Sequence, residues 1–252
     1  MANNNTDNNQ SYQQNRVSIS VFFPCYNEQD NVMRTSQEAV AVLEKLNADY
    51  EVIIVNDGSS DETGKIAEQI SLKNSRVKAV HHPVNLGYGA ALQSGFKNAG
   101  KKLVFYTDGD GQFDIKEMPQ LLPLLEKYDI VSCYRLNRQD NLLRKLNAWC
   151  WTKLVCFLFK MKIRDIDCAF KLYKREIFDN ITLTSTGALI DTEILAKAAR
   201  KGYHITQTGV HHYHRTAGLQ TGANIRVIIR AFKELFKLYK KIQSEENGAK
   251  KI

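Results

Sequence analysis

The stretch "KLVFYTDGDGQFD", residues 102–114, joins an apolar segment to a cluster of acidic side chains. Residues 102–107 are mostly apolar, aromatic or β-branched, which predicts a buried strand. Asp108, Asp110 and Asp114 follow at once, although like charges this close repel one another. The cluster predicts either a cation-binding turn or an Asp-Gly turn that starts a helix expected at residues 117–127.

Strand and helix patterns alternate on both sides of this stretch. Strands are predicted at residues 17–23, 50–56, 76–82, 102–107 and 129–134, and helices at 31–46, 61–72, 88–99 and 117–127. Further on, helices are predicted at about 141–162 and 188–202, and strands at 167–173 and 203–210. This alternation is typical of βαβ units. It predicts an α/β fold with a Rossmann-like, mostly parallel central sheet flanked by helices.

Composition divides the chain of 252 residues into four parts. Residues 1–16 are almost all polar and predict a disordered tail, and residues 17–222 predict one domain. Residues 223–243 predict a basic amphipathic helix, and residues 244–252 a flexible tail. The five cysteines are scattered and no apolar stretch follows the start, so reduced thiols and a cytoplasmic location are expected.

Polar clusters follow three of the predicted strands. They are "PCYNE" at 24–28, "NDGSSD" at 56–61 and "DGDGQ" at 108–112. Each alone could be an ordinary polar loop, but the carboxyl ends of parallel strands form the ligand-binding edge of such sheets. We therefore expect one shared site. There, Asp108 and Asp110 would bind Mg²⁺ or Mn²⁺, with an oxygen from Gln112 and the phosphates of a diphosphate ligand.

Two other nucleotide-binding patterns are not matched. "NLGYGAALQSG", residues 85–95, has the first two glycines of the dinucleotide fingerprint but not the third, and it follows the third predicted strand instead of the first. No glycine-rich loop ending in Gly-Lys-Ser or Gly-Lys-Thr is present. Hydride transfer and P-loop chemistry are therefore disfavoured.

Five motifs in this order resemble family 2 glycosyltransferases of the GT-A fold. They are "VFFPCYNE", "IIVNDGSSDET", "NLGYGAALQSGF", "YTDGDGQFD" and "HRTAGLQTG". The resemblance covers about residues 17–225 and is strongest to the dolichol-phosphate mannose synthase-like subgroup, which transfers a sugar to a polyprenyl phosphate. It implies a metal-dependent enzyme that uses a nucleotide-sugar donor and a polyprenyl-phosphate acceptor.

The resemblance also implies roles for single residues. Those matched to the nucleotide sugar are Pro24, Tyr26, Glu28, Asp57, Asp108, Gly109 and Asp110. Those matched to the metal are Asp108, Asp110 and Gln112, and those matched to the acceptor phosphate are Arg135, Arg144 and Arg215. The implied catalytic residues are Asp110, Arg135 and Arg215. The chain departs from the subgroup where Cys133 and Tyr134 replace Gly-Ser, and where Gln220 and Thr221 replace Ser-Lys. Asp165 matches a subgroup aspartate, and Lys171 replaces an arginine that follows it.

The acceptor decides whether a base is needed. A phosphate monoester is already largely ionised at neutral pH, so it can attack without one. A hydroxyl group of a glycan or lipid would need a base, for which Asp191 or Glu193 is a candidate. The alternative for both residues is a solvated helix face or a charge at a helix start. A membrane-bound pseudoenzyme that serves as a scaffold is a further alternative.

The net charge of +8 is concentrated in part on the last predicted helix. Its apolar residues are Ile225, Ile228, Ile229, Phe232, Leu235, Phe236, Tyr239 and Ile242, and its basic residues are Arg226, Arg230, Lys233, Lys237, Lys240 and Lys241. This pattern predicts peripheral binding to the anionic inner face of a membrane, or else a helix packed on its own domain. Residues 142–162 are also aromatic and basic. No nucleic-acid recognition motif accompanies the charge, and no pattern predicts the oligomeric state.

Overall fold

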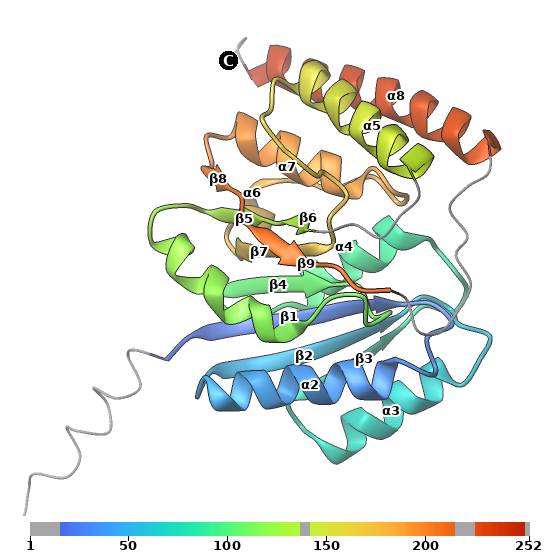
Figure 1. Cartoon of the computed structure of the whole chain (residues 1–252), viewed down its shortest axis with the longest axis vertical. Helices are drawn as coiled ribbons and strands as arrows, with labels where there is room; N and C mark the ends of the chain where they lie inside the picture. The colour runs from blue at the N-terminus through green and yellow to red at the C-terminus, as the bar shows by residue number, and fades with distance from the viewer. Residues whose placement is uncertain (1–15, 137–141, 215–224, 250–252) are drawn as a thin grey trace, which may run out of the picture.

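A computed structural model describes residues 16–136, 142–214 and 225–249, without the side chains of residues 142–145, 225–231 and 246–249 (Figure 1). The predicted tail at residues 1–16 lies outside the described residues except for Arg16. Arg215 and the predicted Gly-Leu-Gln-Thr motif at 218–221 lie outside them as well.

The described chain is built on a sheet of seven strands in the order β3-β2-β1-β4-β7-β5-β8 (Figure 1). The strands are β1 (Ser18–Cys25), β2 (Asp49–Asn56), β3 (Val77–His81), β4 (Leu103–Thr107), β5 (Ile130–Ser132), β7 (Phe170–Lys174) and β8 (Ile205–Thr206). Only β7 is antiparallel to its neighbours β4 and β5. The predicted α/β fold with a mostly parallel sheet is therefore confirmed.

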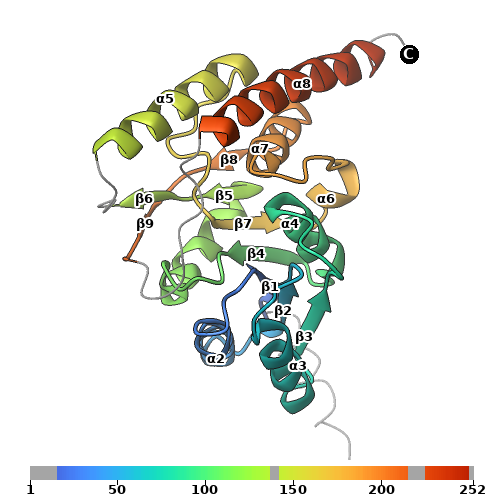
Figure 2. The ribbon, with the colours of Figure 1, turned by 90° about the vertical axis from the view of Figure 1, so that its right-hand side faces the viewer.

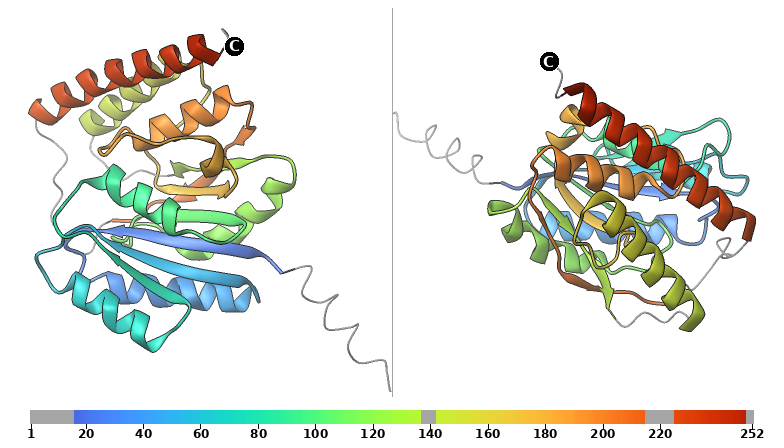
Figure 3. Two further views of the ribbon diagram at one scale, coloured as in Figure 1. Left: turned by 180° about the vertical axis from the view of Figure 1, so that it is seen from behind. Right: turned by 90° about the horizontal axis from the view of Figure 1, so that it is seen from above.

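Helices cover both faces of this sheet, so β1 and β2 are buried along almost their whole length (Figures 1 and 3). On one face, α2 (Val32–Lys45) packs on the 3₁₀-helix η1 (Ile115–Glu126), with α3 (Thr63–Lys73) beside α2. The other face carries α4 (Tyr88–Asn98), α6 (Ile177–Asn180) and α7 (Ile190–Arg200). There, Phe96 of α4 stacks on Phe178 of α6 with 3.9 Å between the ring centroids.

The predicted helix at 117–127 is a 3₁₀-helix that begins two residues earlier, at Ile115. Pro119 and Pro123 lie inside it and lack the N–H groups that a continuous α-helical bonding pattern requires. The Asp114 side chain accepts a hydrogen bond from the Lys116 amide at 3.0 Å and so caps its start.

Two predicted strands are each divided between two sheets. Residues 129–134 contribute β5 to the main sheet, and the chain then enters β6 (Tyr134–Leu136), which pairs with β9 (Gly209–His211). Residues 203–210 are likewise divided between β8 and β9. The change of partner occurs at one residue, because the Cys133 amide bonds to the main sheet at Phe170 and the Tyr134 amide bonds to Thr208.

The helices α5 (Leu142–Phe159) and α8 (Ile225–Ala249) lie side by side beyond α7 (Figures 1 and 2). Trp151 and Phe232 meet edge to face with ring centroids 5.5 Å apart, and Phe159 and Tyr239 do so at 5.7 Å. The prediction that the last helix ends at residue 243 is wrong, because α8 continues to Ala249 through most of the predicted flexible tail. An ion pair of 3.3 Å between Glu245 and Lys197 of α7 contributes to this extension.

Candidate active site

The acidic loop after β4 lies tightly against the end of β1. A Cβ atom on Gly109 would come within 2.5 Å of the Cys25 sulfur and 3.1 Å of the Pro24 carbonyl oxygen. Gly111 has a φ of +72°, a conformation that favours glycine. The Asp-Gly-Asp-Gly sequence therefore allows the loop to turn sharply at the carboxyl edge of the sheet, where a ligand of this fold class would bind.

Asp108 is half-buried at the start of this loop, directly after β4. The Tyr88 hydroxyl, from the first residue of α4, donates a hydrogen bond to Asp108 Oδ1 at 3.0 Å. Burial and then the negative charge of Asp110 raise the pKa of Asp108 to about 8. The two carboxylates thus repel each other, and a divalent cation between them would relieve that repulsion. Two such hard oxygen donors fit Mg²⁺ or Mn²⁺.

Asp110 and Gln112 connect the acidic loop to the segment that follows β9. Asp110 Oδ1 accepts a hydrogen bond from the Gln112 amide at 3.0 Å. Gln112 Nε2 donates to the Tyr213 carbonyl at 3.0 Å, and the Tyr213 amide donates to the Gln112 carbonyl at 2.9 Å. The orientation of the Gln112 side chain is therefore set by Tyr213. Its role as a metal ligand stays a prediction.

The candidate metal site is not a cluster of three or more protein ligands of the usual kinds in the part of the chain that the structure describes. Within the described ranges, no group of three or more His, Cys, Asp or Glu side chains is arranged to hold a metal ion. Asp108 and Asp110 are the carboxylates of the acidic loop that could bind a cation here, together with the predicted Gln112 oxygen and the oxygens of its ligand. This is the usual manner of Mg²⁺, which binds through one or two carboxylates together with substrate phosphates and water.

Asp57, at the end of β2, uses its carboxylate within the protein. Oδ1 accepts from the Leu86 amide at 2.9 Å and lies 2.6 Å from His82 Nδ1, while Oδ2 accepts from the Gly87 amide at 3.0 Å. These bonds fix the loop that leads into α4 and so fix the backbone next to Tyr88. A contact between Asp57 and a nucleotide stays a prediction.

The remaining residues matched to the nucleotide sugar lie at the end of β1, as predicted from strand order. Pro24 is part of the strand, and the Tyr26 side chain is 47% exposed at the edge. Glu28 is buried and accepts a hydrogen bond from Asn31 Nδ2 at 2.8 Å. The structure brings Pro24, Tyr26 and the acidic loop to one edge of the sheet, while their contacts to a donor stay predictions.

The sequence model of glycosyl transferase family 2 matches residues 20–182. The chain belongs to this family. Two curated relatives, both undecaprenyl-phosphate 4-deoxy-4-formamido-L-arabinose transferases, come from Proteus mirabilis and Enterobacter sp.. They are 31% and 30% identical to the chain over 64% and 83% of its residues. The chain spans 50% and 64% of their respective lengths.

Solved structures confirm the GT-A fold expected for a family 2 glycosyltransferase. A glucosyl-3-phosphoglycerate synthase from Mycobacterium tuberculosis, solved with Mn²⁺, UDP-glucose and phosphoglyceric acid, superposes with a TM-score of 0.62. The two sequences are 18% identical, and the superposed region covers 87% of this chain and 79% of the synthase chain. At this identity the likeness establishes the fold alone.

Of the arginines that the family resemblance assigns to the acceptor phosphate, the structure describes the side chain of Arg135. It lies on β6 and forms a two-point ion pair with Asp165, with Nε to Oδ2 at 2.7 Å and Nη2 to Oδ1 at 2.8 Å. Asp165 therefore fixes the plane of the guanidinium group. The Arg144 side chain and all of Arg215 lie outside the described residues.

Asp191 and Glu193, the two candidate bases, lie in the first turn of α7. They are 3% and 0% exposed, so the interpretation of a solvated helix face is wrong. Asp191 accepts hydrogen bonds from the Tyr106 hydroxyl and, at 2.8 Å, from Lys171. The two carboxylates are buried because α7 packs its first turn onto the sheet, where Lys171 of β7 supplies a positive charge for Asp191.

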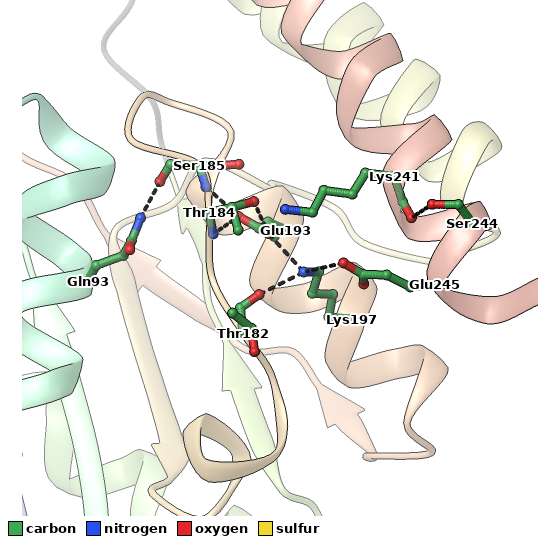
Figure 4. A network of polar contacts seen from close by, with 9 residues as sticks. All are labelled: Gln93, Thr182, Thr184, Ser185, Glu193, Lys197, Lys241, Ser244 and Glu245. Carbon is green, nitrogen blue, oxygen red and sulfur yellow. Dashed lines mark hydrogen bonds and ion pairs between the residues drawn. The ribbon is translucent and has the colours of Figure 1, made fainter. Parts of the chain in front are cut away.

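Glu193 holds the segment that precedes α7 (Figure 4). Its carboxylate accepts from the amides of Thr184 at 2.9 Å and Ser185 at 2.7 Å, and forms an ion pair with Lys197 at 3.0 Å. Burial acts to raise the pKa of Glu193, but the hydrogen bonds from these amides and from Lys197 lower it below its ordinary value. Gln93 of α4 donates to the Ser185 carbonyl at 2.8 Å, so this segment also supports α4.

Tyr88, Tyr106 and Lys171 were not singled out as functional from the sequence. Tyr88 lay in a predicted helix and Tyr106 in a predicted strand, where both would be ordinary apolar positions. Lys171 carried a signal, because a lysine within the apolar stretch "CAFKLY" requires an anionic partner if it is buried. The partner itself could not be predicted, since Asp191 is 20 residues away in the sequence.

Proposed function

We propose that the chain transfers a sugar from a nucleotide-diphosphate sugar to a polyprenyl phosphate, with Mg²⁺ or Mn²⁺, at the cytoplasmic face of a membrane. Two curated relatives are named as transferases that act on undecaprenyl phosphate, which supports this acceptor class. A GT-A neighbour was solved with Mn²⁺ and UDP-glucose, which supports the metal and the donor class. Asp108 and Asp110 supply the matching carboxylates at the edge of the sheet.

The observation that carries the proposal is the burial of Asp191 and Glu193. A base must reach the proton that it removes, and both carboxylates are enclosed and bonded to protein groups. This supports an acceptor that needs no base. The phosphate group of a polyprenyl phosphate is such an acceptor, because its second pKa is about 6.

The proposed chemistry is then chiefly electrostatic. A cation held by Asp108 and Asp110 would stabilise the negative charge of the departing nucleoside diphosphate. Arg135, oriented by Asp165, would bind the incoming phosphate as a fixed positive group. In this proposal Arg144 and Arg215 add to the same positive surface.

Transfer to a hydroxyl group is the second candidate function, because an accessible acidic side chain lies close to Asp165 and Arg135. Asp167 is exposed and lies within electrostatic reach of Asp165, Arg135 and Lys171. It is thus a base candidate that the sequence did not indicate. Its position makes Asp167→Asn a test of the acceptor class.

We expect the purified protein to form a glycolipid from a UDP- or GDP-sugar only when Mn²⁺ or Mg²⁺ and a polyprenyl phosphate are present. Asp167→Asn should retain this activity within about twofold, because an ionised phosphate needs no proton acceptor. The measurement is a radiolabelled transfer assay with polyprenyl phosphate and polyprenol in parallel. Transfer to the alcohol, lost in Asp167→Asn, would establish the second candidate. If titration calorimetry detects no metal-dependent nucleotide binding, the scaffold alternative is favoured.

The proposed membrane surface is formed by α5 and α8. Aromatic side chains are exposed on both helices, among them Trp149 and Phe157 of α5 and Phe236 of α8. Phe157 is 81% exposed. Leu235, Leu238 and Ile242 of α8 are buried, so the helix packs on its own domain with one face and leaves the other to solvent. In the described ranges, no helix combines the length and apolar character needed to cross a bilayer.

Charge reversal on the outer face of α8 should release the protein from anionic vesicles. Lys233, Lys237 and Lys240 are exposed there, and each basic residue near such a surface contributes about 1 kcal/mol. We expect the triple Lys→Glu variant to lose cosedimentation with vesicles that contain phosphatidylserine. Lys241 is left intact because its side chain extends toward α7 (Figure 4). The melting temperature of the triple variant should not change, because the buried face of α8 is untouched.

A matched control carries the same change of net charge at the opposite end of the molecule. Lys45 of α2 and Lys65 and Lys73 of α3 are exposed. Figure 1 shows α2 and α3 at the end of the molecule opposite α5 and α8. The triple Lys→Glu variant of these three lysines should still cosediment. Equal release of both variants would show that net charge, and not the α5–α8 surface, determines binding.

A further inference from the structure

Lys171 is a charged side chain with no exposure to solvent, in the middle of β7. Its ammonium group lies 2.8 Å from Asp191 Oδ1, 3.2 Å from the Tyr106 hydroxyl oxygen and 3.2 Å from the Ile166 carbonyl oxygen. The Cys168 carbonyl oxygen is a further acceptor. An ammonium group this enclosed cannot contact the nucleotide-sugar donor or the phosphate of the acceptor substrate. A buried ion pair is by itself weak evidence for a stabilising role. The Lys171–Asp191 pair therefore calls for another role.

The ion pair is connected to the acidic loop through two tyrosines. The Tyr106 hydroxyl donates to Asp191. Burial raises the pKa of Tyr88, and the Tyr106 hydroxyl lies close enough to the Tyr88 hydroxyl to act to lower it. The Tyr88 hydroxyl donates to Asp108 Oδ1 at 3.0 Å. Two neighbouring tyrosine hydroxyls therefore lie between the Lys171–Asp191 ion pair and the carboxylate at the end of β4, and each donates its one hydrogen to a different carboxylate.

The backbone around Tyr88 is held as firmly as its hydroxyl. Asp57 binds the Gly87 amide at 3.0 Å on one side. On the other side, a Cβ atom on Gly89 would come within 2.5 Å of the Ser185 carbonyl oxygen, so α4 and the segment that precedes α7 are in close contact. Tyr88 can therefore restrain Asp108 without moving itself.

We propose that Tyr88 and Tyr106, anchored by the Lys171–Asp191 ion pair, are positioning residues that hold the Asp108 carboxylate in place for the divalent cation. Asp191 thus acts through Asp108 and not on the acceptor. The proposal rests on the proposed metal-dependent function, and it adds which buried groups shape the metal site. Fixed geometry matters here because Mg²⁺ tolerates little departure from octahedral coordination.

Two variants remove single hydroxyl groups from this set and leave the ion pair intact. Tyr88→Phe removes the hydrogen bond to Asp108, and Tyr106→Phe removes the connection to Asp191. Tyr173→Phe is the matched control. Tyr173 is buried and stacks on Tyr106 with 6.3 Å between ring centroids, but its hydroxyl has no hydrogen-bond partner within the described part of the chain.

The experiment measures Mn²⁺ affinity in the presence of UDP or GDP by titration calorimetry, nucleotide affinity in EDTA, and the melting temperature. We expect Tyr88→Phe to weaken Mn²⁺ binding about tenfold, the effect of one hydrogen bond to a charged group, without changing nucleotide affinity in EDTA. Tyr106→Phe should weaken Mn²⁺ binding about threefold, and should add nothing in the double variant with Tyr88→Phe. Tyr173→Phe should match the unmodified protein.

Three results would overturn the proposal. The first is an unchanged Mn²⁺ affinity in Tyr88→Phe. The second is an equal loss of nucleotide affinity in EDTA, which would mean a general structural effect of Tyr88. The third is an identical response of Tyr106→Phe and Tyr173→Phe, which would separate Asp191 from the site. Absence of metal-dependent nucleotide binding in the unmodified protein is a distinct result, because it refutes the proposed function as well.

Discussion

Asp110→Asn should lower sugar transfer about a thousandfold or more, the scale seen when a group that stabilises developing charge is lost. The asparagine keeps an oxygen that can accept the hydrogen bond from the Gln112 amide, so the loop should retain its shape. The negative charge that would bind the cation is lost. The measurements are transfer activity over a range of Mn²⁺ concentrations, together with the melting temperature.

Asp114→Asn is the matched control for this prediction. Asp114 accepts a hydrogen bond from the Lys116 amide at 3.0 Å, much as Asp110 accepts one from Gln112. Asp114→Asn removes one negative charge from the loop region, as Asp110→Asn does. It does so at the cap of η1 and not at the predicted metal site. We expect activity within about threefold of the unmodified protein, since an asparagine caps nearly as well. Near-normal transfer by Asp110→Asn would refute the metal role of Asp110.

Glu193→Gln should lower the free energy of unfolding by about 3–5 kcal/mol, the range measured when one partner of a buried ion pair is removed. The glutamine oxygen could still accept from the Thr184 and Ser185 amides, but its NH₂ group would then face the Lys197 ammonium group, which is itself a donor and would lose its nearest negative charge. Denaturant unfolding at neutral pH is the measurement. Glu245→Gln is the control, because Glu245 contacts the same Lys197 at 3.3 Å from an exposed position and should cost less than about 1 kcal/mol.

The effect of Glu193→Gln should depend on pH. The pKa of Glu193 is lowered in the folded protein, so its ionised carboxylate stabilises the fold at pH values above its pKa in the unfolded chain. That contribution is lost as the pH falls through the lower folded pKa. The difference between the two proteins should therefore be full at about pH 7 and shrink towards about pH 3. A difference that is constant with pH would contradict the assigned ionic role.

The sequence predicted the layers of the fold better than its connections. Apolar and β-branched stretches mark β1, β2 and β4, because strands covered on both faces need such residues. The direction of β7 leaves no comparable mark, since a buried strand has the same composition in either direction. The end of α8 depends on the contact between Glu245 and Lys197, which only the packing of two helices reveals. Pro119 and Pro123 could have marked η1 as irregular, but the prediction of a helix at 117–127 did not take them into account.

For the candidate site, the sequence predicted where the acidic residues lie but not what the residues of α7 do. Strand order placed Asp57, Asp108 and Asp110 at one edge, because parallel strands end on the same side of a sheet. The roles of Asp191 and Glu193 could not be predicted, since the same first turn of a helix can face solvent or the sheet. Only the packing of α7 shows that these carboxylates hold Lys171 and the Thr184–Ser185 amides.

The position of β7 has a consequence for synthesis on the ribosome. β7 lies between β4 and β5, although it follows both of them in the chain. The nascent chain can pair β1, β2, β3 and β4 as they emerge, but the outer edge of β4 stays without a partner until residues 170–174 are made. An uncovered edge strand can pair with another chain, so this interval is when newly made molecules are open to aggregation and to chaperones.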